Sequence, residues 1–254
     1  MKKLETLFGV YFRKLLRRNP LTRETLITIV AGPMQGSRVS VALGDDYRYG
    51  RYESETVAEA QKRIGKKDVV YDIGANAGYL TMVFAQRCQL VYAFEPLELN
   101  VLRWRRHITV NKIRNAELYP YAICDSDRTV IFAKGHSAFS NRYERTGPCS
   151  EGTRVEGRSI DSLVASKALM PPNALKIDVE GAEFDVLQGA KETLATSHPL
   201  IFLATHDCHN PGVQASCVTF LETYGYECRK TAEVKVMPGL CDYICTPSKA
   251  MLPI

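Results

Sequence analysis

The feature that most constrains this chain is a regular alternation, starting near residue 68, of short apolar runs with longer segments of helical periodicity. Apolar strands that alternate with helices form parallel βαβ units, and helices cover both faces of the sheet. Ligands of such sheets bind beyond the carboxyl ends of the strands, where the strand order reverses. We therefore expect a doubly wound α/β sheet with its functional residues at strand ends. The expected strands are 68–73, 90–94, 117–123, 174–179 and 199–205, and the expected helices are 79–87, 97–111, 183–194 and 213–224.

Shorter elements flank and interrupt this alternation. Further strands are expected at 25–30, 38–42, 129–133, 153–158, 227–229 and 243–245, and a short helix at 57–64. The first two of these strands enclose a turn-rich loop, which predicts a hairpin. A chain of 254 residues suits one α/β domain with an N-terminal extension. We expect a basic amphipathic helix at 1–24, a hairpin and entry segment at 25–66, the main domain at 67–247 and a tail at 248–254.

The positive charge is concentrated at the N-terminus. The net charge is +5, and much of the excess lies in the first 23 residues. A nucleic-acid-binding protein usually carries a basic face through its fold, so we expect no nucleic-acid partner. Within residues 4–16 apolar side chains recur at helical spacing, with basic ones between them. We favour a helix that docks on its own domain or on a partner chain, and weak contact with a membrane surface stays open.

Composition also bears on the compartment. No apolar run approaches the roughly 20 residues of a membrane span, and the N-terminus lacks the pattern of a signal peptide. The eight cysteines contain no CxxC pair, which favours reduced thiols in a reducing compartment. We therefore expect a soluble, cytoplasmic protein.

A glycine-containing loop follows the first strand of the main domain. It contains Asp72, Gly74, Asn76 and Gly78 and ends at Tyr79. Glycine lets the backbone turn sharply and approach a ligand, and the helix that follows presents free N–H groups to an anion. A dinucleotide would favour glycine at positions 76 and 79. S-adenosylmethionine has no pyrophosphate, its carboxylate suits the helix N-terminus and its ammonium suits Asp72, so the loop favours the methyl donor over NAD.

The second strand ends in Glu95 and Pro96, and Glu95 lies 21 residues after Gly74. An acid at this spacing reaches the tip of the neighbouring strand and can accept hydrogen bonds from both ribose hydroxyls. We therefore expect Glu95 to bind the ribose of the cofactor. Ala122, near the end of the third strand, completes the expected cofactor-binding residues.

The fourth strand leads into an acidic segment. Asp178, Glu180, Glu183 and Asp185 fall within eight residues. Acids in the first turn of a helix stabilise its dipole, which accounts for Glu183 and Asp185 without any function. Asp178 is different, because we expect it within the strand, where an unpaired charge is costly.

Taken together, these motifs resemble the FkbM-type methyltransferases. The matching segments are 70–79, 94–96, 159–163, 176–183 and 187–190, and the hairpin with 50–53 resembles the entry segment of the family. The resemblance implies a class I methyltransferase fold with seven strands, the last antiparallel. It also implies O-methylation of a hydroxyl on a sugar, glycan or other small molecule, with S-adenosylmethionine as donor. One departure is Thr205, which stands where the family often has an acid before His206.

Methyl transfer needs alignment of the acceptor with the methyl group, and a base helps when the acceptor is a hydroxyl. His206 is our candidate base because its ordinary pKa is near neutrality, and Asp178 and Glu180 are the other catalytic candidates. Asp178 and Glu180 lack a further ligand in the sequence pattern, and we interpret the grouping of His206, Cys208 and His209 as chance, so no metal is expected.

Three other functions stay open. An NAD-dependent oxidoreductase is disfavoured by Asn76 and Tyr79, an aminopropyl transferase by the fourth-strand motif, and a non-catalytic module by the presence of both Asp72 and Glu95. The acceptor is not encoded in a readable motif, and we expect the N-terminal region and residues 134–152 to shape its pocket.

Overall fold

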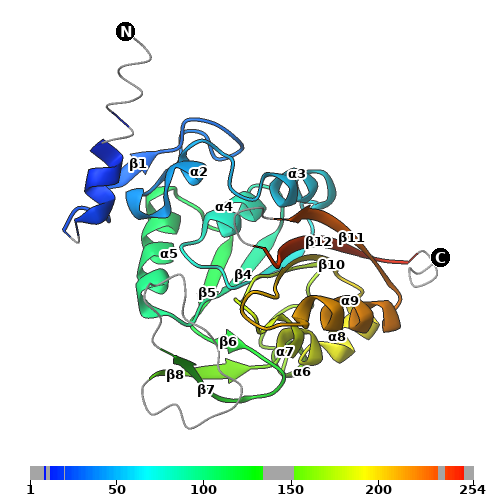
Figure 1. Cartoon of the computed structure of the whole chain (residues 1–254). Coiled ribbons are helices and arrows are strands. Elements are labelled where there is room, and N and C mark those ends of the chain that lie inside the picture. The colour runs from blue at the N-terminus through cyan, green and yellow to red at the C-terminus, as the bar shows by residue number, and fades with distance from the viewer. Residues whose placement is uncertain (1–8, 10–11, 20, 134–151, 234–237, 249–254) are drawn as a thin grey trace.

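A central seven-stranded sheet organises the molecule (Figure 1). The computed structural model describes residues 9, 12–19, 21–133, 152–233 and 238–248, so most of the expected loop 134–152 lies outside the described residues. The strands, in spatial order, are β11 (Tyr226–Glu233), β12 (Leu240–Pro247), β10 (Leu200–His206), β9 (Ala174–Ile177), β3 (Val69–Ile73), β4 (Leu90–Phe94) and β5 (Ala116–Tyr119). Strand β12 runs antiparallel to both of its neighbours, while β3, β4, β5, β9 and β10 are parallel. The expected α/β sheet with an antiparallel last strand is confirmed.

Helices cover both faces of the sheet, as the apolar strands require. On one face lie α3 (Ser54–Arg63), α4 (Tyr79–Ala85) and α5 (Glu98–Val110). On the other lie α6 (Ile160–Ala165), α7 (Glu183–Gln188), α8 (Lys191–Ser197) and α9 (Val213–Thr223). Strand β3 is buried along its whole length: Tyr71 and Ile73 join the core under α6–α9, and Val70 joins the core under α3–α5. Side chains alternate between the faces of a strand, so Asp72 lies on the same side as Val70.

The strand order reverses between β3 and β9, because the chain continues from β3 to β4 and β5 on one side and to β9 and β10 on the other. The loops after β3 and β9 therefore meet at one edge. Gly74 shows how close they come: with φ of 80°, a Cβ built on it would lie 1.8 Å from the carbonyl oxygen of Asp178. Only glycine fits this position.

The strands expected at 227–229 and 243–245 are longer in the structure, as β11 and β12, and two other expected elements are divided. The strand predicted at 117–123 divides into β5 and β6 (Ala122–Ile123), because Pro120 lies between them and cannot donate a ladder hydrogen bond. Strand β6 belongs to a second sheet with β7 (Arg128–Ala133) and β8 (Gly152–Arg158). The helix predicted at 183–194 is broken into α7 and α8 at Gly189, where a Cβ would lie 2.1 Å from the Cys124 carbonyl oxygen.

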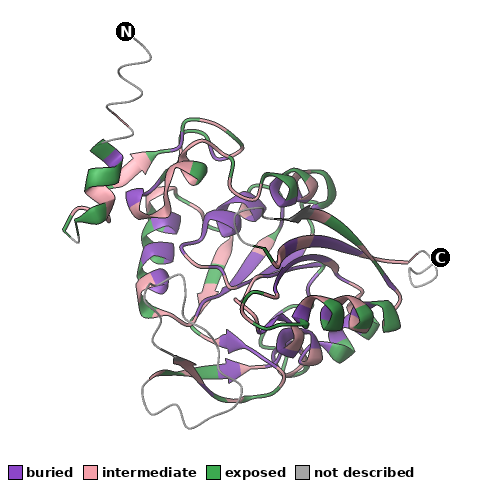
Figure 2. Cartoon of the chain, viewed as in Figure 1, coloured by how far each residue is buried: buried purple, intermediate pink, exposed green. Residues whose placement is uncertain are grey.

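The expected hairpin is confirmed as the antiparallel pair β1 (Leu26–Thr28) and β2 (Arg38–Ser40), which the 3₁₀ turn Val41–Leu43 and α2 (Asp45–Arg48) follow. Residues 12–18 before it are helical. Two of their basic side chains form ion pairs with Asp45 at the start of α2. Arg13 is buried and lies 2.9 Å from Asp45, which Arg17 also contacts at 3.1 Å. Phe12 and Leu15 are exposed instead, and Figure 2 shows much of this helix as exposed.

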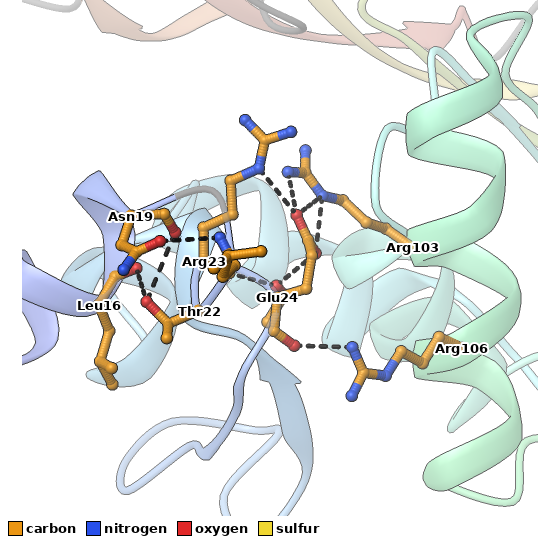
Figure 3. A network of polar contacts seen from close by, with 9 residues as sticks. Leu16, Asn19, Thr22, Arg23, Glu24, Arg103 and Arg106 are labelled. Carbon is orange, nitrogen blue, oxygen red and sulfur yellow. Dashed lines mark hydrogen bonds and ion pairs between the residues drawn. The ribbon is translucent and has the colours of Figure 1, made fainter.

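The segment that follows this helix is fixed to α5 through Glu24 (Figure 3). The Glu24 carboxylate pairs with the buried Arg103 at 2.5 Å, and its backbone carbonyl accepts a hydrogen bond from Arg106. Thr22 closes the preceding turn by donating to the carbonyl of Leu16. Within the described residues, no helix combines the length and the apolar character that crossing a bilayer requires.

Candidate functional site

A cavity of about 890 Å³, partly open to solvent, lies at the carboxyl ends of β3, β4 and β9, where the strand order reverses. Of the predicted site residues, Gly74, Asn76, Glu95, Ala122, Asp178 and Glu180 line it. A smaller hollow of about 320 Å³ adjoins it, and Gly74, Asn76 and Asp178 line both.

Glu95 is held at the tip of β4 with both carboxylate oxygens in use. It accepts hydrogen bonds from the backbone N–H groups of Asn76 and Leu97, each at 2.9 Å. An ionised carboxylate has about four acceptor sites, so Glu95 keeps capacity to accept from a ligand hydroxyl. The side chain is only 5% exposed, and this burial raises its pKa to about 7 although the hydrogen bonds oppose the shift. The arrangement suits recognition of a diol.

Two buried amide oxygens give an independent sign of a ligand. Oδ1 of Asn76 and Oδ1 of Asn100 are buried without a hydrogen-bond partner, and both residues line the main cavity. A buried polar atom without a partner is costly, and a nucleoside ligand offers donors for both. Asn76, with φ of 47°, and Asn100, on α5 beside Glu95, thus fit the cofactor that the loop predicts. Asn100 could not be singled out from the sequence, because an asparagine early in a helix is common.

Asp72 and Gly78 take supporting positions. Asp72 is 1% exposed, lines only the smaller hollow and accepts a hydrogen bond from Thr81 at 2.5 Å. Burial raises its pKa to about 6, against the Thr81 hydrogen bond. Trp104 donates to the same Thr81 hydroxyl at 3.0 Å, and a Cβ on Gly78 would lie 2.6 Å from the Trp104 ring. Gly78 therefore leaves room for an indole behind the loop rather than for a ligand.

The candidate catalytic residues come together where β9 and β10 end. We had expected Asp178 to lie within the strand. Strand β9 ends at Ile177, however, and Asp178 follows it. His206 is the last residue of β10 and is 2% exposed. Its Nε2 lies 3.5 Å from Asp178 Oδ1 and 3.7 Å from Glu180 Oε2. Two strands that are adjacent in the sheet thus place an imidazole against two carboxylates.

Glu183 belongs to this cluster, although the sequence accounted for it by the helix dipole alone. It is fully buried, accepts a hydrogen bond from Nδ1 of His206 at 2.7 Å and accepts another from the Gly181 backbone at 2.9 Å. The carboxylate fixes the imidazole so that Nε2 faces Asp178 and Glu180. Cys208 is exposed, whereas Nδ1 of His209 lies 3.0 Å from Glu180.

Proton affinities in the cluster are shifted strongly. Burial alone would lower the pKa of His206, but the Glu183 hydrogen bond and the charges of Asp178 and Glu180 raise it to about 9. Burial and the Asp178 charge raise the pKa of Glu180 to about 7. Burial opposes ionisation of Asp178, yet the charges of Lys176 and His206 keep its pKa below the usual value. The imidazole is therefore protonated at neutral pH, and Glu180, whose pKa is close to neutrality, is the carboxylate poised to exchange a proton.

A buried lysine beside the cluster was not recognised as functional in the sequence. Lys176 lies in β9 opposite Asp72 of β3 and is 2% exposed. Its Nζ lies 3.3 Å from Asp178 and 3.4 Å from Glu53. Burial opposes the lysine charge, but these carboxylates raise its pKa. A lysine inside an apolar strand was the one available signal, because such a charge needs a buried partner.

Thr205, which replaces an expected acid, is buried and donates a hydrogen bond to the Cys241 carbonyl of β12 at 3.1 Å. Thr205 therefore stabilises the pairing of β10 with β12. His206 is the titratable group that this strand end supplies.

Comparisons with known proteins agree with this geometry. The model of the methyltransferase FkbM domain matches residues 72–228, which is more than half of the chain. The hexuronic acid methyltransferase AglP of Haloferax volcanii is 28% identical over 148 residues, which cover 57% of this chain and 59% of that protein. The AMB antimetabolite synthetase AmbE of Pseudomonas aeruginosa is 28% identical over 181 residues, covering 55% of this chain and 8% of that protein. The chain thus spans less than two thirds of either relative.

Among solved structures, methyltransferase FkbM from Methylobacillus flagellatus has a similar fold, with a TM-score of 0.53 and 16% identity. The likeness covers 80% of this chain and 53% of that one. It supports the class I methyltransferase architecture seen in the sheet order. Together with the domain match, it leads to a plain assignment: this chain belongs to the FkbM methyltransferase family.

Proposed function

We propose that this protein transfers a methyl group from S-adenosylmethionine to a hydroxyl of a sugar, with a hexuronic acid as the class of acceptor. The observation that carries the donor is Glu95, a buried carboxylate at the tip of β4, with the partnerless amide oxygens of Asn76 and Asn100 in the same cavity. The acceptor class rests on the hexuronic acid methyltransferase relative.

The donor would occupy the main cavity with its ribose on Glu95 and its adenine beside Ala122 and the adjoining residues of β6. Its amino-acid end would lie toward Gly74 and the smaller hollow, where Asp72 supplies negative charge. The helix N-terminus of α4 follows this loop and favours the carboxylate of the donor.

The acceptor would bind beside Asp178 and Glu180, which line the same cavity. In the transfer, a lone pair of the acceptor oxygen forms a bond to the methyl carbon while the carbon–sulfur bond breaks. The electron pair stays on sulfur, which leaves S-adenosylhomocysteine. The hydroxyl proton passes to Glu180, because a base with a pKa near the working pH is the most effective. His206 and Glu183 hold this carboxylate pair in place.

The experiment is a transfer assay with S-adenosylmethionine labelled in the methyl group. Glucuronic acid and glucose are offered in parallel, since the two differ only at C6, which carries a carboxylate in the first and a hydroxymethyl group in the second, and the products are separated and the label located. We expect a labelled methyl ether of the uronic acid and an equal amount of S-adenosylhomocysteine. Glu180→Gln should reduce the transfer ~100-fold or more. Label on neither sugar would rule out the acceptor class, and label on glucose alone would show that the carboxylate is not recognised.

A further inference from the structure

Three potential metal ligands converge where β9 and β10 end. One donor atom each from Asp178, Glu180 and His206 lies within 4.8 Å of the other two, and Nε2 of His206 is 3.5 Å and 3.7 Å from the two carboxylates. Around a tetrahedral ion with bonds of about 2.1 Å, neighbouring ligands are about 3.4 Å apart. A cation fits between these atoms after small side-chain movements. We propose that Asp178, Glu180 and His206 bind a divalent cation.

The imidazole is already oriented as a ligand, and a bound cation would displace the proton that Nε2 carries at neutral pH. Glu183, fully buried, accepts the Nδ1 hydrogen of His206 at 2.7 Å, so the other nitrogen faces the two carboxylates. Histidines that bind metals characteristically donate their second N–H to a carboxylate or carbonyl, which fixes the ring and raises its basicity. His206 is 2% exposed, and this buried pairing is the second observation, independent of the convergence itself, that points to a cation.

Each carboxylate also contacts a nitrogen of a residue outside the three proposed ligands. Nδ1 of His209 lies 3.0 Å from Glu180 Oε2, and Nζ of Lys176 lies 3.3 Å from Asp178 Oδ2. The Asp178 oxygen that faces His206 is the other one, Oδ1. A cation at the cluster therefore leaves the Lys176 pair intact. Glu180 presents the same oxygen, Oε2, to His206 and to His209, so a cation at the cluster would share that oxygen with His209.

The donor set indicates the kind of cation. One imidazole with two carboxylates suits Mn²⁺, Fe²⁺ or Zn²⁺, whereas Ca²⁺ and Mg²⁺ prefer oxygen ligands alone. Three protein ligands leave coordination positions open, and Asp178 and Glu180 line the main cavity. On the proposed function, those positions would receive the acceptor hydroxyl and the carboxylate of the uronic acid. A cation there polarises the hydroxyl and helps its proton to leave.

Binding is tested with Mn²⁺ alone, by titrating the full chain after removal of metals with a chelator and following free Mn²⁺ by electron paramagnetic resonance. We expect one Mn²⁺ per chain. His206→Ala and Glu180→Gln should weaken binding at least 10-fold, with folding checked by circular dichroism. The control is His198→Asn, because His198 lies beyond the opposite end of β10 and bonds to the Leu194 carbonyl. Equal affinity in all variants, or no stoichiometric binding, would overturn the proposal.

A second arm separates this proposal from the proposed function. Methyl transfer by the chelated enzyme is measured before and after Mn²⁺ is restored. Full activity without metal would overturn a catalytic role for the cation and leave the methyltransferase function standing. Stoichiometric Mn²⁺ binding with no transfer to any uronic acid would instead refute the acceptor class and leave the metal site standing.

Discussion

Gly74→Ala tests the contact that joins the cofactor loop to the acidic cluster. Gly74 has φ of 80°, and an added Cβ would lie 1.8 Å from the Asp178 carbonyl oxygen. A left-handed conformation costs an L-residue about 1–2 kcal/mol. The overlap must also separate the loops after β3 and β9, and this movement breaks the hydrogen bond from the Asp178 N–H to the Ile73 carbonyl. Losing a buried backbone hydrogen bond costs a further 1–3 kcal/mol or so.

Gly36→Ala is the matched control. Gly36 has φ of 88°, and an added Cβ meets nothing within 4 Å. Gly36→Ala should therefore be destabilised only by the left-handed conformation, by about 1–2 kcal/mol. Urea unfolding followed by circular dichroism should show Gly74→Ala to be less stable than Gly36→Ala by about 1–3 kcal/mol. Equal stability of the two variants would refute the reasoning, because the contact with Asp178 would then carry no energy.

Three further perturbations follow from the site and the N-terminal segment. Because Glu95 has a pKa raised to about 7, it gains a proton as pH falls through that value and loses an acceptor for the ribose. Affinity for S-adenosylhomocysteine, measured by calorimetry, should fall in the wild type as pH drops through about 7, and Glu95→Gln should lack this step and keep only the fall near pH 6 that comes from Asp72. Because His206 holds the Asp178 and Glu180 carboxylates in place, His206→Ala should lower turnover ~100-fold with donor affinity nearly unchanged, and near-normal turnover would contradict this positioning role. Arg13→Ala breaks the contacts of a buried guanidinium with Asp45 and Tyr49. Limited proteolysis should therefore cleave the N-terminal segment of this variant faster than that of Arg18→Ala, the control at an exposed site. Equal cleavage rates would contradict the docking of this helix through Arg13.

The sequence predicted the sheet well because its strands are short, apolar and separated by helices of clear periodicity. It failed where tertiary contacts override local pattern. Pro120 divides an apolar run between two sheets, and Gly189 breaks a helix because the Cys124 carbonyl passes close by. Neither the change of sheet at Pro120 nor the contact of Gly189 with Cys124 can be inferred from the local sequence.

The same distinction holds for the site. Glu95 could be found because the distance from the glycine loop to the next strand end is set by the βαβ unit. Glu183 could not, since a first-turn acid is common and its partner His206 is 23 residues away in the chain. Lys176 and Glu53 are likewise more than a hundred residues apart in the sequence, and only folding brings Nζ of Lys176 within 3.4 Å of Oε2 of Glu53.

The central claim, that the cavity at the strand ends receives S-adenosylmethionine, is tested most directly by calorimetric titration of the full chain with S-adenosylhomocysteine and, separately, with NAD. We predict one S-adenosylhomocysteine bound per chain, no binding of NAD, and a loss of about 1–3 kcal/mol in Glu95→Ala from unpaired ribose hydroxyls. Binding of NAD without S-adenosylhomocysteine, or unchanged affinity in a folded Glu95→Ala protein, would contradict the account.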